Sequence, residues 1–238
     1  MALTTLALDG DDTLWHSETH FAVTTGRVLD LVRPWVDGEG ATAHLLEVER
    51  KNLDVFGYGV KAFILSVIET VIEVSDGQVP ADRIHEVVGW AKELLDHPVE
   101  LMDGVAGTID RLARSYRLLL ITKGDLLHQE SKVARSGLAD RFEAVEVVGD
   151  KDVATYRRIL DRYGIEPSEF VMAGNSVRSD VAPVVELGGW GVHVPFHLTW
   201  ALEAHDGSGL GDRVAVADGF SELPSALAEL AGRATAGR

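Results

Sequence analysis

The sequence predicts an α/β protein in which a parallel sheet core carries an inserted all-α domain. From about residue 100 onward, short apolar runs alternate with helical patterns, which is the rhythm of a parallel sheet with crossover helices. Between residues 15 and 99 the apolar side chains recur only every three or four residues, and no strand pattern interrupts them. The apolar run Leu3–Leu8 precedes this stretch. We therefore expect it to be a strand of the same sheet, separated from the others by the insertion.

The expected elements follow from the apolar spacing of each segment. Four helices are expected in the inserted part, over residues 17–33, 41–56, 60–74 and 82–96. The later part predicts helices over 104–115, 126–136, 152–163, 180–187 and 221–230, and strands over 117–122, 142–148, 170–173, 191–194 and 213–217. Glycines directly after three of these helices can terminate them. The core domain should thus span residues 1–14 and 100–238, with the helical domain over 15–99.

The composition is that of an ordinary globular protein. The chain has 238 residues, of which 46% are hydrophobic and 25% charged, and it can bury a full core. Its formal net charge of −16 argues against nucleic acid or an anionic membrane as a partner, because both require a basic surface. The sequence contains no cysteine, which excludes disulfides, zinc–thiolate sites and thiol nucleophiles.

Targeting signals are not visible in the sequence. The N-terminal residues lack the basic segment of a signal peptide, and their apolar stretch is short. No run reaches the roughly 20 apolar residues that a transmembrane helix requires. We therefore expect a cytoplasmic protein.

Polar residues follow the predicted strands at the points where the strands end. Ligands of open parallel sheets bind at this edge, so these residues are the candidates for a functional site. They are, in chain order, Asp9 and Asp11, Thr122 with Lys123 and Gly124, Lys151, and Asn175 with Asp180. Carboxylates, a hydroxyl and a lysine on one edge are suited to a phosphoryl group bound together with a hard divalent cation.

These motifs resemble the four motifs of the haloacid dehalogenase-like superfamily. The sequence Asp9-x-Asp11-x-Thr13 after an apolar strand is similar to the first motif. Thr122 is similar to the second and Lys151 to the third, and the segment Gly174-Asn175 through Asp180 is similar to the fourth. The motifs occur in the order of the family, each at the end of a strand. The resemblance implies a Rossmann-like core, and the position of the insertion resembles a helical first-type cap.

The resemblance also implies a role for each site residue. Asp9 would be the nucleophile that forms an aspartyl-phosphate, and Asp11 would protonate the leaving oxygen and then activate water. The residues expected to bind the phosphate are Thr122, Lys123 and Gly124, while Lys151 would neutralise its charge. Mg²⁺ would be the cofactor, bound by Asp9, the Asp11 carbonyl and the acidic fourth motif.

Two residues depart from the family pattern, and a third, Asp11, indicates which of the family's reactions the chain resembles. Asp12 stands where the family most often has Gly, and Asn175 where Asp is commoner. Whether Asn175 or Asp180 is the direct metal ligand therefore stays open. Family members that remove halogen, or that cleave carbon–phosphorus bonds, lack an acid at the position of Asp11. The chain therefore resembles the phosphatase-type members.

The leading hypothesis is a Mg²⁺-dependent phosphohydrolase that cleaves a small phosphorylated metabolite. A phosphomutase would use the same core and transfer the phosphoryl group within one substrate. A phospho-accepting signalling domain would combine clustered acids, Thr and Lys in a parallel α/β fold, but it carries the phosphorylated Asp on a later strand and needs no helical insertion. The sequence indicates neither the natural substrate nor the oligomeric state.

Overall fold

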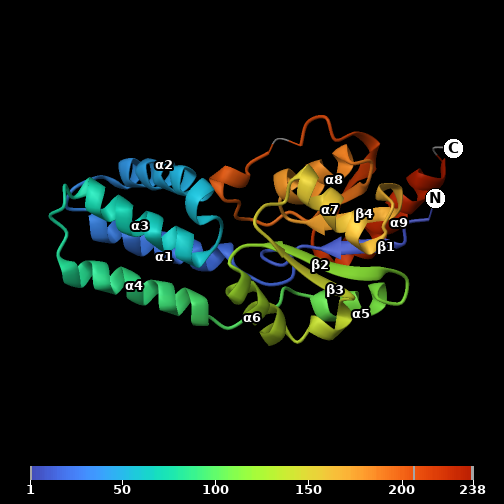
Figure 1. Ribbon diagram of the computed structural model, residues 1–238, viewed down its shortest axis with the longest axis horizontal. Helices are drawn as coiled ribbons and strands as arrows, with labels where there is room; N and C mark the ends of the chain where they lie inside the picture. The colour runs from blue at the N-terminus through green and yellow to red at the C-terminus, as the bar shows by residue number, and fades with distance from the viewer. Residues whose placement is uncertain (1, 206, 237–238) are drawn as a thin grey trace. The chain divides into compact units, whose positions relative to one another are not determined.

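The computed structural model describes residues 2–205 and 207–236. The chain divides into two compact units, one comprising Met1–His16 and Val99–Arg238 and the other Ser17–Pro98. The first unit contains the sheet, and the described part of the second is helical. Figure 1 labels most of the helices and strands of both.

The described residues of the first unit form a six-stranded parallel sheet with the order β3-β2-β1-β4-β5-β6. The strands are β1 (Thr5–Leu8), β2 (Arg117–Lys123), β3 (Ala144–Val148), β4 (Phe170–Gly174), β5 (Trp190–His193) and β6 (Val214–Val216). Thr5 of β1 is in register with Arg117 of β2 on one side and with Phe170 of β4 on the other. The chain adds strands first on one side of β1 and then on the other. The topological switch point, where open sheets bind ligands, therefore lies at the end of β1.

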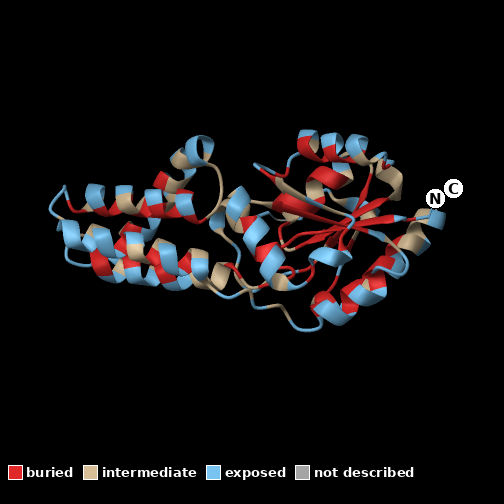
Figure 2. Ribbon diagram, turned by 60° about the horizontal axis from the view of Figure 1, so that its bottom comes forward, coloured by how far each residue is buried: buried red, intermediate tan, exposed pale blue. Residues whose placement is uncertain are grey.

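Helices cover both faces of the sheet and complete a three-layer Rossmann-like fold. One apolar cluster contains Leu6 and Leu8 of β1 together with side chains of α5 (Val105–Leu112), α6 (Leu126–Ser136) and α9 (Leu223–Ala236). A second cluster contains Ala7 of β1 with side chains of α7 (Val153–Tyr163) and α8 (Ala182–Glu186). Successive residues of a strand point to opposite faces, which explains this division. The strands appear as a buried layer in Figure 2, and the predicted fold class is confirmed.

The second unit is built from four helices within its described residues. They are α1 (Glu18–Val32), α2 (Gly38–Phe56), α3 (Val60–Val74) and α4 (Ala81–Asp96). Their shared apolar core includes Val28, Leu45, Val67 and Trp90, one from each helix. Helix α3 packs against the other three helices. This position explains why its sequence is the most continuously apolar of the four.

The segments that leave and re-enter the first unit run side by side. Trp15 forms an antiparallel bridge with Leu101. The N–H of His16 donates to the carbonyl of Glu100 at 3.0 Å, and the N–H of Met102 donates to that of Leu14 at 2.9 Å. The all-helical segment therefore starts and ends at one place in the sheet unit, as an insertion into a single loop requires.

The helix predicted over residues 180–187 has a different start. A π-helix, Val177–Val181, precedes α8, and Ser176 caps it by accepting a hydrogen bond from the N–H of Ser179 at 3.1 Å. The π-helix places Asp180 inside the helical segment, where its N–H donates to the carbonyl of Ser176. Asp180 is therefore not the N-cap, and its side chain is available for the sheet edge. Single π-turns are frequently found at functional sites.

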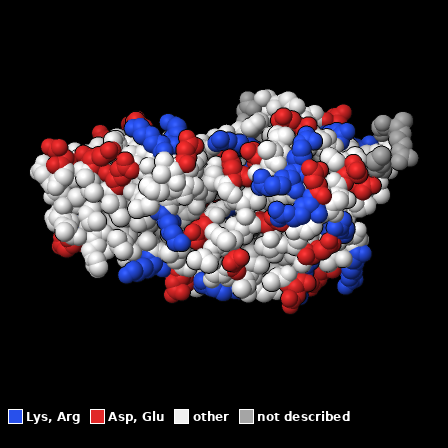
Figure 3. Space-filling model, viewed as in Figure 1, with Lys and Arg blue, Asp and Glu red and all other residues white. Residues whose placement is uncertain are grey.

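The outer surface carries charges of both signs. On the face drawn in Figure 3, Lys and Arg side chains lie among Asp and Glu side chains. Among the described helices, none has both the length and the apolar character needed to cross a membrane.

We predict that Gly191→Ala lowers the free energy of unfolding by about 1–3 kcal/mol, as expected for overpacking. A Cβ atom at Gly191 would lie 2.7 Å from Cγ1 of Val181, so β5 and the π-helix would have to separate. The matched control is Gly232→Ala in α9, where no atom lies within 4 Å of the added methyl group. This control should be neutral or stabilising by up to about 1 kcal/mol. Chemical denaturation of both variants measures the difference, and equal effects would contradict the tight contact.

Candidate active site

Asp9 and Asp11 lie in a tight loop that follows the central strand β1. The N–H of Leu14 donates to the carbonyl of Gly10 at 2.8 Å, and the N–H of Asp12 donates to that of Trp15 at 2.7 Å. Asp12 has a φ of +59°, in the left-handed region that Asp adopts more readily than most residues. This conformation gives the physical reason why Gly is common at this position in the family and why Asp can replace it.

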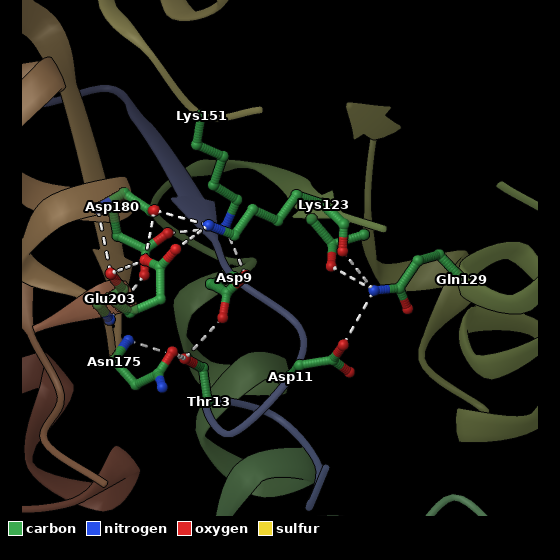
Figure 4. Close-up of polar contacts among 12 residues, drawn as sticks. Asp9, Asp11, Thr13, Lys123, Gln129, Lys151, Asn175, Asp180 and Glu203 are labelled. Carbon is green, nitrogen blue, oxygen red and sulfur yellow. Dashed lines mark hydrogen bonds and ion pairs between the residues drawn. The ribbon is translucent and has the colours of Figure 1, made fainter. Parts of the chain in front are cut away.

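Lys151 is the centre of a buried ion cluster in this loop region. Its Nζ contacts Oδ1 of Asp9 and, at 2.7 Å, Oδ1 of Asp180 (Figure 4). All three residues are at most 5% exposed. They come from the loop after β1, the loop after β3 and the π-helix after β4. The structure thus brings together three of the residues that the sequence places at this edge.

The second oxygen of Asp180 is bound by the backbone. Oδ2 accepts a hydrogen bond from the N–H of Ser176 at 2.9 Å. A Cβ atom on Gly174 would lie 2.2 Å from this oxygen, so only glycine at that position leaves room for the carboxylate. Both oxygens of Asp180 are therefore engaged, one by Lys151 and one by the chain itself. In this geometry Asp180 orients the lysine.

The cluster holds two carboxylates against one ammonium group. Burial raises the pKa of Asp9 to about 7; repulsion from Asp180 adds to the rise, and Lys151 opposes it. Burial alone would lower the pKa of Lys151, but attraction to Asp180 and Asp9 outweighs it and holds this pKa above its usual value. The site therefore carries a surplus of negative charge that an additional cation would offset.

Thr13 links Asp9 to the loop after β4. Its hydroxyl donates to Oδ2 of Asp9 at 3.1 Å and accepts the N–H of Asn175 at the same distance. Oδ1 of Asn175 lies 3.5 Å from this hydroxyl. Thr13 thus connects Asn175 to the Asp9 carboxylate, whose other oxygen contacts Lys151. Within the described residues, no group of three or more His, Asp or Glu side chains is arranged to hold a metal ion. The carboxylates of Asp9 and Asp180 both contact Lys151.

Asp11 is held by three donors. It accepts hydrogen bonds from Nε1 of Trp15 at 2.6 Å, from Nε2 of Gln129 at 2.9 Å and from Nζ of Lys132, which contacts both of its oxygens. Burial raises the pKa of Asp11, but the charge of Lys132 and the three donors outweigh this effect and bring the pKa below its usual value. Sequence reasoning did not identify Gln129 and Lys132. The sequence offered one signal for them: they stand three positions apart on the same predicted helix, next to the apolar Val133, and Val133 is buried in the structure.

The residues after β2 separate into two groups. Thr122 is buried, and its Oγ1 accepts a hydrogen bond from Nε2 of Gln129 at 3.2 Å. Gly124 has a φ of +139° and lies against the same glutamine side chain. The ammonium group of Lys123 instead contacts Oγ of Ser179 at 2.8 Å and the carboxylate of Glu203. Thr122 is therefore linked to Asp11 through Gln129, whereas the side chain of Lys123 is engaged by Glu203.

Two curated proteins resemble part of the chain. N-acylneuraminate-9-phosphatase of Mus musculus is 27% identical over 97 residues, which cover 39% of this chain and 39% of that protein. Glyceraldehyde 3-phosphate phosphatase of Methanothermobacter thermautotrophicus is 31% identical over 125 residues, which cover 50% of this chain and 54% of that protein. The matches thus span only about two fifths to one half of these relatives.

Solved structures resemble the chain along nearly its whole length. A haloacid dehalogenase-like family hydrolase from Xanthomonas campestris is 38% identical with a TM-score of 0.89, and the match covers 100% of this chain and 95% of that one. A 2-haloacid dehalogenase from Pseudomonas syringae is 24% identical with a TM-score of 0.59, covering 96% and 99%. The latter similarity shows the fold alone.

A family model supplies the assignment. The model described as haloacid dehalogenase-like hydrolase matches residues 3–188, which include the loop after β1, Thr122, Lys151 and the π-helix with Asp180. The Xanthomonas structure extends the similarity through the remaining residues. The chain therefore belongs to the haloacid dehalogenase-like hydrolase family.

Proposed function

We propose that the protein is a Mg²⁺-dependent phosphohydrolase that cleaves a small phosphate monoester through an aspartyl-phosphate. The observation that carries the proposal is the buried Asp9 carboxylate at the end of the central strand, oriented by Lys151 on one oxygen and Thr13 on the other. The second acid, Asp11, lies two residues further on in the same loop. The two partial matches to proteins named as phosphatases support this choice within the family.

Asp9 is proposed as the nucleophile. One carboxylate oxygen attacks phosphorus, so that a bond from Asp9 to phosphorus forms while the bond from phosphorus to the ester oxygen breaks. Lys151 stabilises the anionic phosphoryl group, because its charge is already placed at the carboxylate and needs no reorganisation during the reaction. Asp180 keeps Lys151 in this orientation through its own contact at 2.7 Å.

Asp11 is proposed to transfer the protons. It gives a proton to the departing ester oxygen and later removes one from the water that hydrolyses the acyl-phosphate. Its low pKa without substrate is suited to the second step. A bound phosphate places negative charge nearby, which raises the pKa of a carboxyl group and favours the protonated form for the first step. Thr122 accepts from Gln129, so its own O–H can donate to a phosphoryl oxygen.

The donor set fits a hard divalent cation. Asp9, the carbonyl of Asp11 and the amide oxygen of Asn175 offer oxygen ligands, and Mg²⁺ is bound through oxygen. The surplus negative charge that contributes to the high pKa of Asp9 fits a cation as well. Asn175 is the proposed ligand from the loop after β4, because its amide oxygen lies beside the Thr13 hydroxyl that binds Asp9, whereas the oxygens of Asp180 face Lys151 and the N–H of Ser176. When bound, the ion supplies positive charge next to the phosphate.

The alternative functions have less support. Dehalogenation occurs on the same fold, but members with that activity lack an acid at the position of Asp11. A phosphomutase would share the core, and no feature of the described residues favours it over hydrolysis. A phospho-accepting signalling domain does not explain an inserted helical unit or an acidic pair after the first strand.

The second unit, residues 17–98, is proposed to act as a cap that determines substrate selectivity. The support is its insertion into the loop directly after the acidic pair, through the adjacent segments at residues 14–16 and 100–102. The attack of Asp9 on the phosphorus of a charged substrate benefits from the exclusion of bulk water. A movable inserted unit can exclude it while the substrate is bound.

Removal of divalent cations should abolish phosphate release. We expect full loss of hydrolysis of p-nitrophenyl phosphate in excess chelator and recovery on addition of Mg²⁺. Without the cation, the negatively charged phosphate would face the surplus negative charge of the site. A panel of sugar, polyol and nucleoside monophosphates assayed with Mg²⁺ then identifies the best substrate. Full turnover with chelator present would contradict the proposed cofactor.

Asp9→Asn and Asp11→Asn should differ in their dependence on the leaving group. Asp9→Asn should abolish turnover of every ester, because no oxygen nucleophile remains. Asp11→Asn should lower hydrolysis of alkyl monoesters by about 10²-fold or more, the usual contribution of a general acid, and affect p-nitrophenyl phosphate less. Release of the alcohol or of p-nitrophenol in the first turnover measures this, because the later hydrolysis of the acyl-phosphate is the same for both esters. Equal losses on the two esters in Asp11→Asn would show that the assigned roles are wrong.

Replacement of residues 17–98 by a short Gly/Ser linker should reduce selectivity among monoesters more than it reduces turnover of p-nitrophenyl phosphate. The flanking segments are already paired, so a short linker can join them. The ratio of kcat/KM between the best and the poorest substrate of the panel is the measurement, with circular dichroism as the control for folding. An unchanged ratio in a folded variant would contradict a role in selectivity.

A further inference from the structure

We propose that Gln129 and Lys132 of α6 are positioning residues that hold the Asp11 carboxylate for proton transfer and connect it to Thr122. The inference rests on the phosphohydrolase function proposed above and adds two residues to its site. The spacing of three residues places both side chains on the same side of the helix. The helix is fixed at its start, where the Asp125 side chain accepts the N–H of His128 at 3.1 Å.

Helix α6 has the reverse of an ordinary amphipathic pattern near the site. Gln129 and Lys132 are 2% and 7% exposed, whereas Leu126 and Leu127 are 54% and 71% exposed. A helix that only stabilised the fold would turn leucines toward the sheet and leave lysine in water. The inward orientation of the polar pair therefore indicates a role other than packing.

The Lys132–Asp11 ion pair supports the same conclusion. Nζ of Lys132 contacts both carboxylate oxygens, the longer distance being 2.7 Å. The Lys132 side chain is 9% exposed and that of Asp11 28%, so Lys132 loses most of its hydration, and an ion pair regains such a cost only in part. The pair is therefore poorly explained by stability. Contacts to both oxygens do, however, restrict rotation of the carboxylate.

Gln129 connects two groups of the proposed reaction. Its Nε2 lies 2.9 Å from Oδ2 of Asp11, 3.2 Å from Oγ1 of Thr122 and 2.7 Å from the carbonyl of Lys123. Figure 4 shows the Gln129 side chain between Asp11 and Lys123. One amide group thus ties the proton-transferring acid to the residue proposed to bind the phosphate. A Cβ atom on Gly124 would lie 3.0 Å from this nitrogen, so the glycine keeps the space open.

The other end of Gln129 is a buried acceptor. Among the described residues, Oε1 of Gln129 is buried without a hydrogen-bond partner. Buried polar atoms in native proteins are rarely left in this state, and those that are often belong to functional sites. The amide is therefore held in place by its nitrogen contacts to Asp11 and Thr122, although its oxygen gains no bond. This cost is consistent with a positioning role.

Fixed geometry matters most where the reaction needs a proton. An alkoxide leaving group requires a correctly placed acid, whereas p-nitrophenolate leaves with little protonation. Loss of a residue that positions Asp11 should therefore slow alkyl esters selectively. A residue needed only for folding would slow both kinds of ester alike.

The test compares Lys132→Met, Gln129→Leu and Lys132→Arg with the wild-type protein. Release of the leaving group in the first turnover is measured with p-nitrophenyl phosphate and with the best alkyl monoester of the panel, because this step precedes hydrolysis of the common acyl-phosphate. Lys132→Met and Gln129→Leu should lower this rate on the alkyl ester by about 10²-fold, a typical general-acid effect, and on the aryl ester by less than about tenfold. Lys132→Arg should recover at least part of the alkyl activity. Arg135→Met, which removes an exposed cation one turn further along α6, should change neither rate.

The outcomes separate the two proposals. If the wild-type protein releases no phosphate from either ester, both the function and the inference are overturned. If the wild-type protein is active and Lys132→Met and Gln129→Leu show equal losses, or none, on the two esters, only the positioning role is overturned. Thermal unfolding of each variant identifies loss of the fold. If Lys132→Met does not fold, the leaving-group dependence of Gln129→Leu decides the question by the same criterion.

Discussion

The contact between Lys151 and the carboxylates of Asp9 and Asp180 is the interaction on which the site depends. All three groups are almost completely buried, and a charge removed from water is tolerated only with partners of the opposite sign. Each group therefore needs the segment that carries the others. The loop after β1, the loop after β3 and the π-helix after β4 must meet at one point, and glycine at position 174 leaves the space that Asp180 occupies. Removing one partner from such a cluster typically costs about 3–5 kcal/mol.

The sheet provides this meeting point through its strand order. β1 lies between β2 and β4. The chain adds strands on one side of β1 and later on the other, so the crossover connections diverge at the end of β1 and leave a crevice where ligands bind. The strand is apolar on both faces, with Leu6 and Leu8 in one core and Ala7 in the other. Its polar residues can therefore appear only after it ends. The same topology brings α6 beside the loop, where Gln129 and Lys132 reach Asp11.

Several local features of the site favour function over stability. Asp12 adopts a left-handed conformation, a π-helix replaces a regular helix start, and α6 exposes leucine while it buries lysine. Each feature is unfavourable taken alone, and each orients a group toward the end of β1. Local violations of this kind are expected where a protein sacrifices stability for a precise arrangement. Membership in a hydrolase family gives these features a common explanation.

The sequence by itself determined the fold class, the order of the elements and the residues at the strand ends. Apolar periodicity is a local signal, and so is the presence of polar residues directly after a predicted strand, where open parallel sheets bind ligands. The sequence did not determine the partners of those residues. Lys123 contacts Glu203, 80 positions away, and Gln129 joins Thr122 to Asp11. Both contacts depend on which helix packs at which edge of the sheet. The π-helix before α8, from which Asp180 contacts Lys151, was likewise not predicted, since spacing alone predicts an ordinary helix there. Contacts between distant segments exist only once the sheet has brought them together, and the tertiary structure alone decided them.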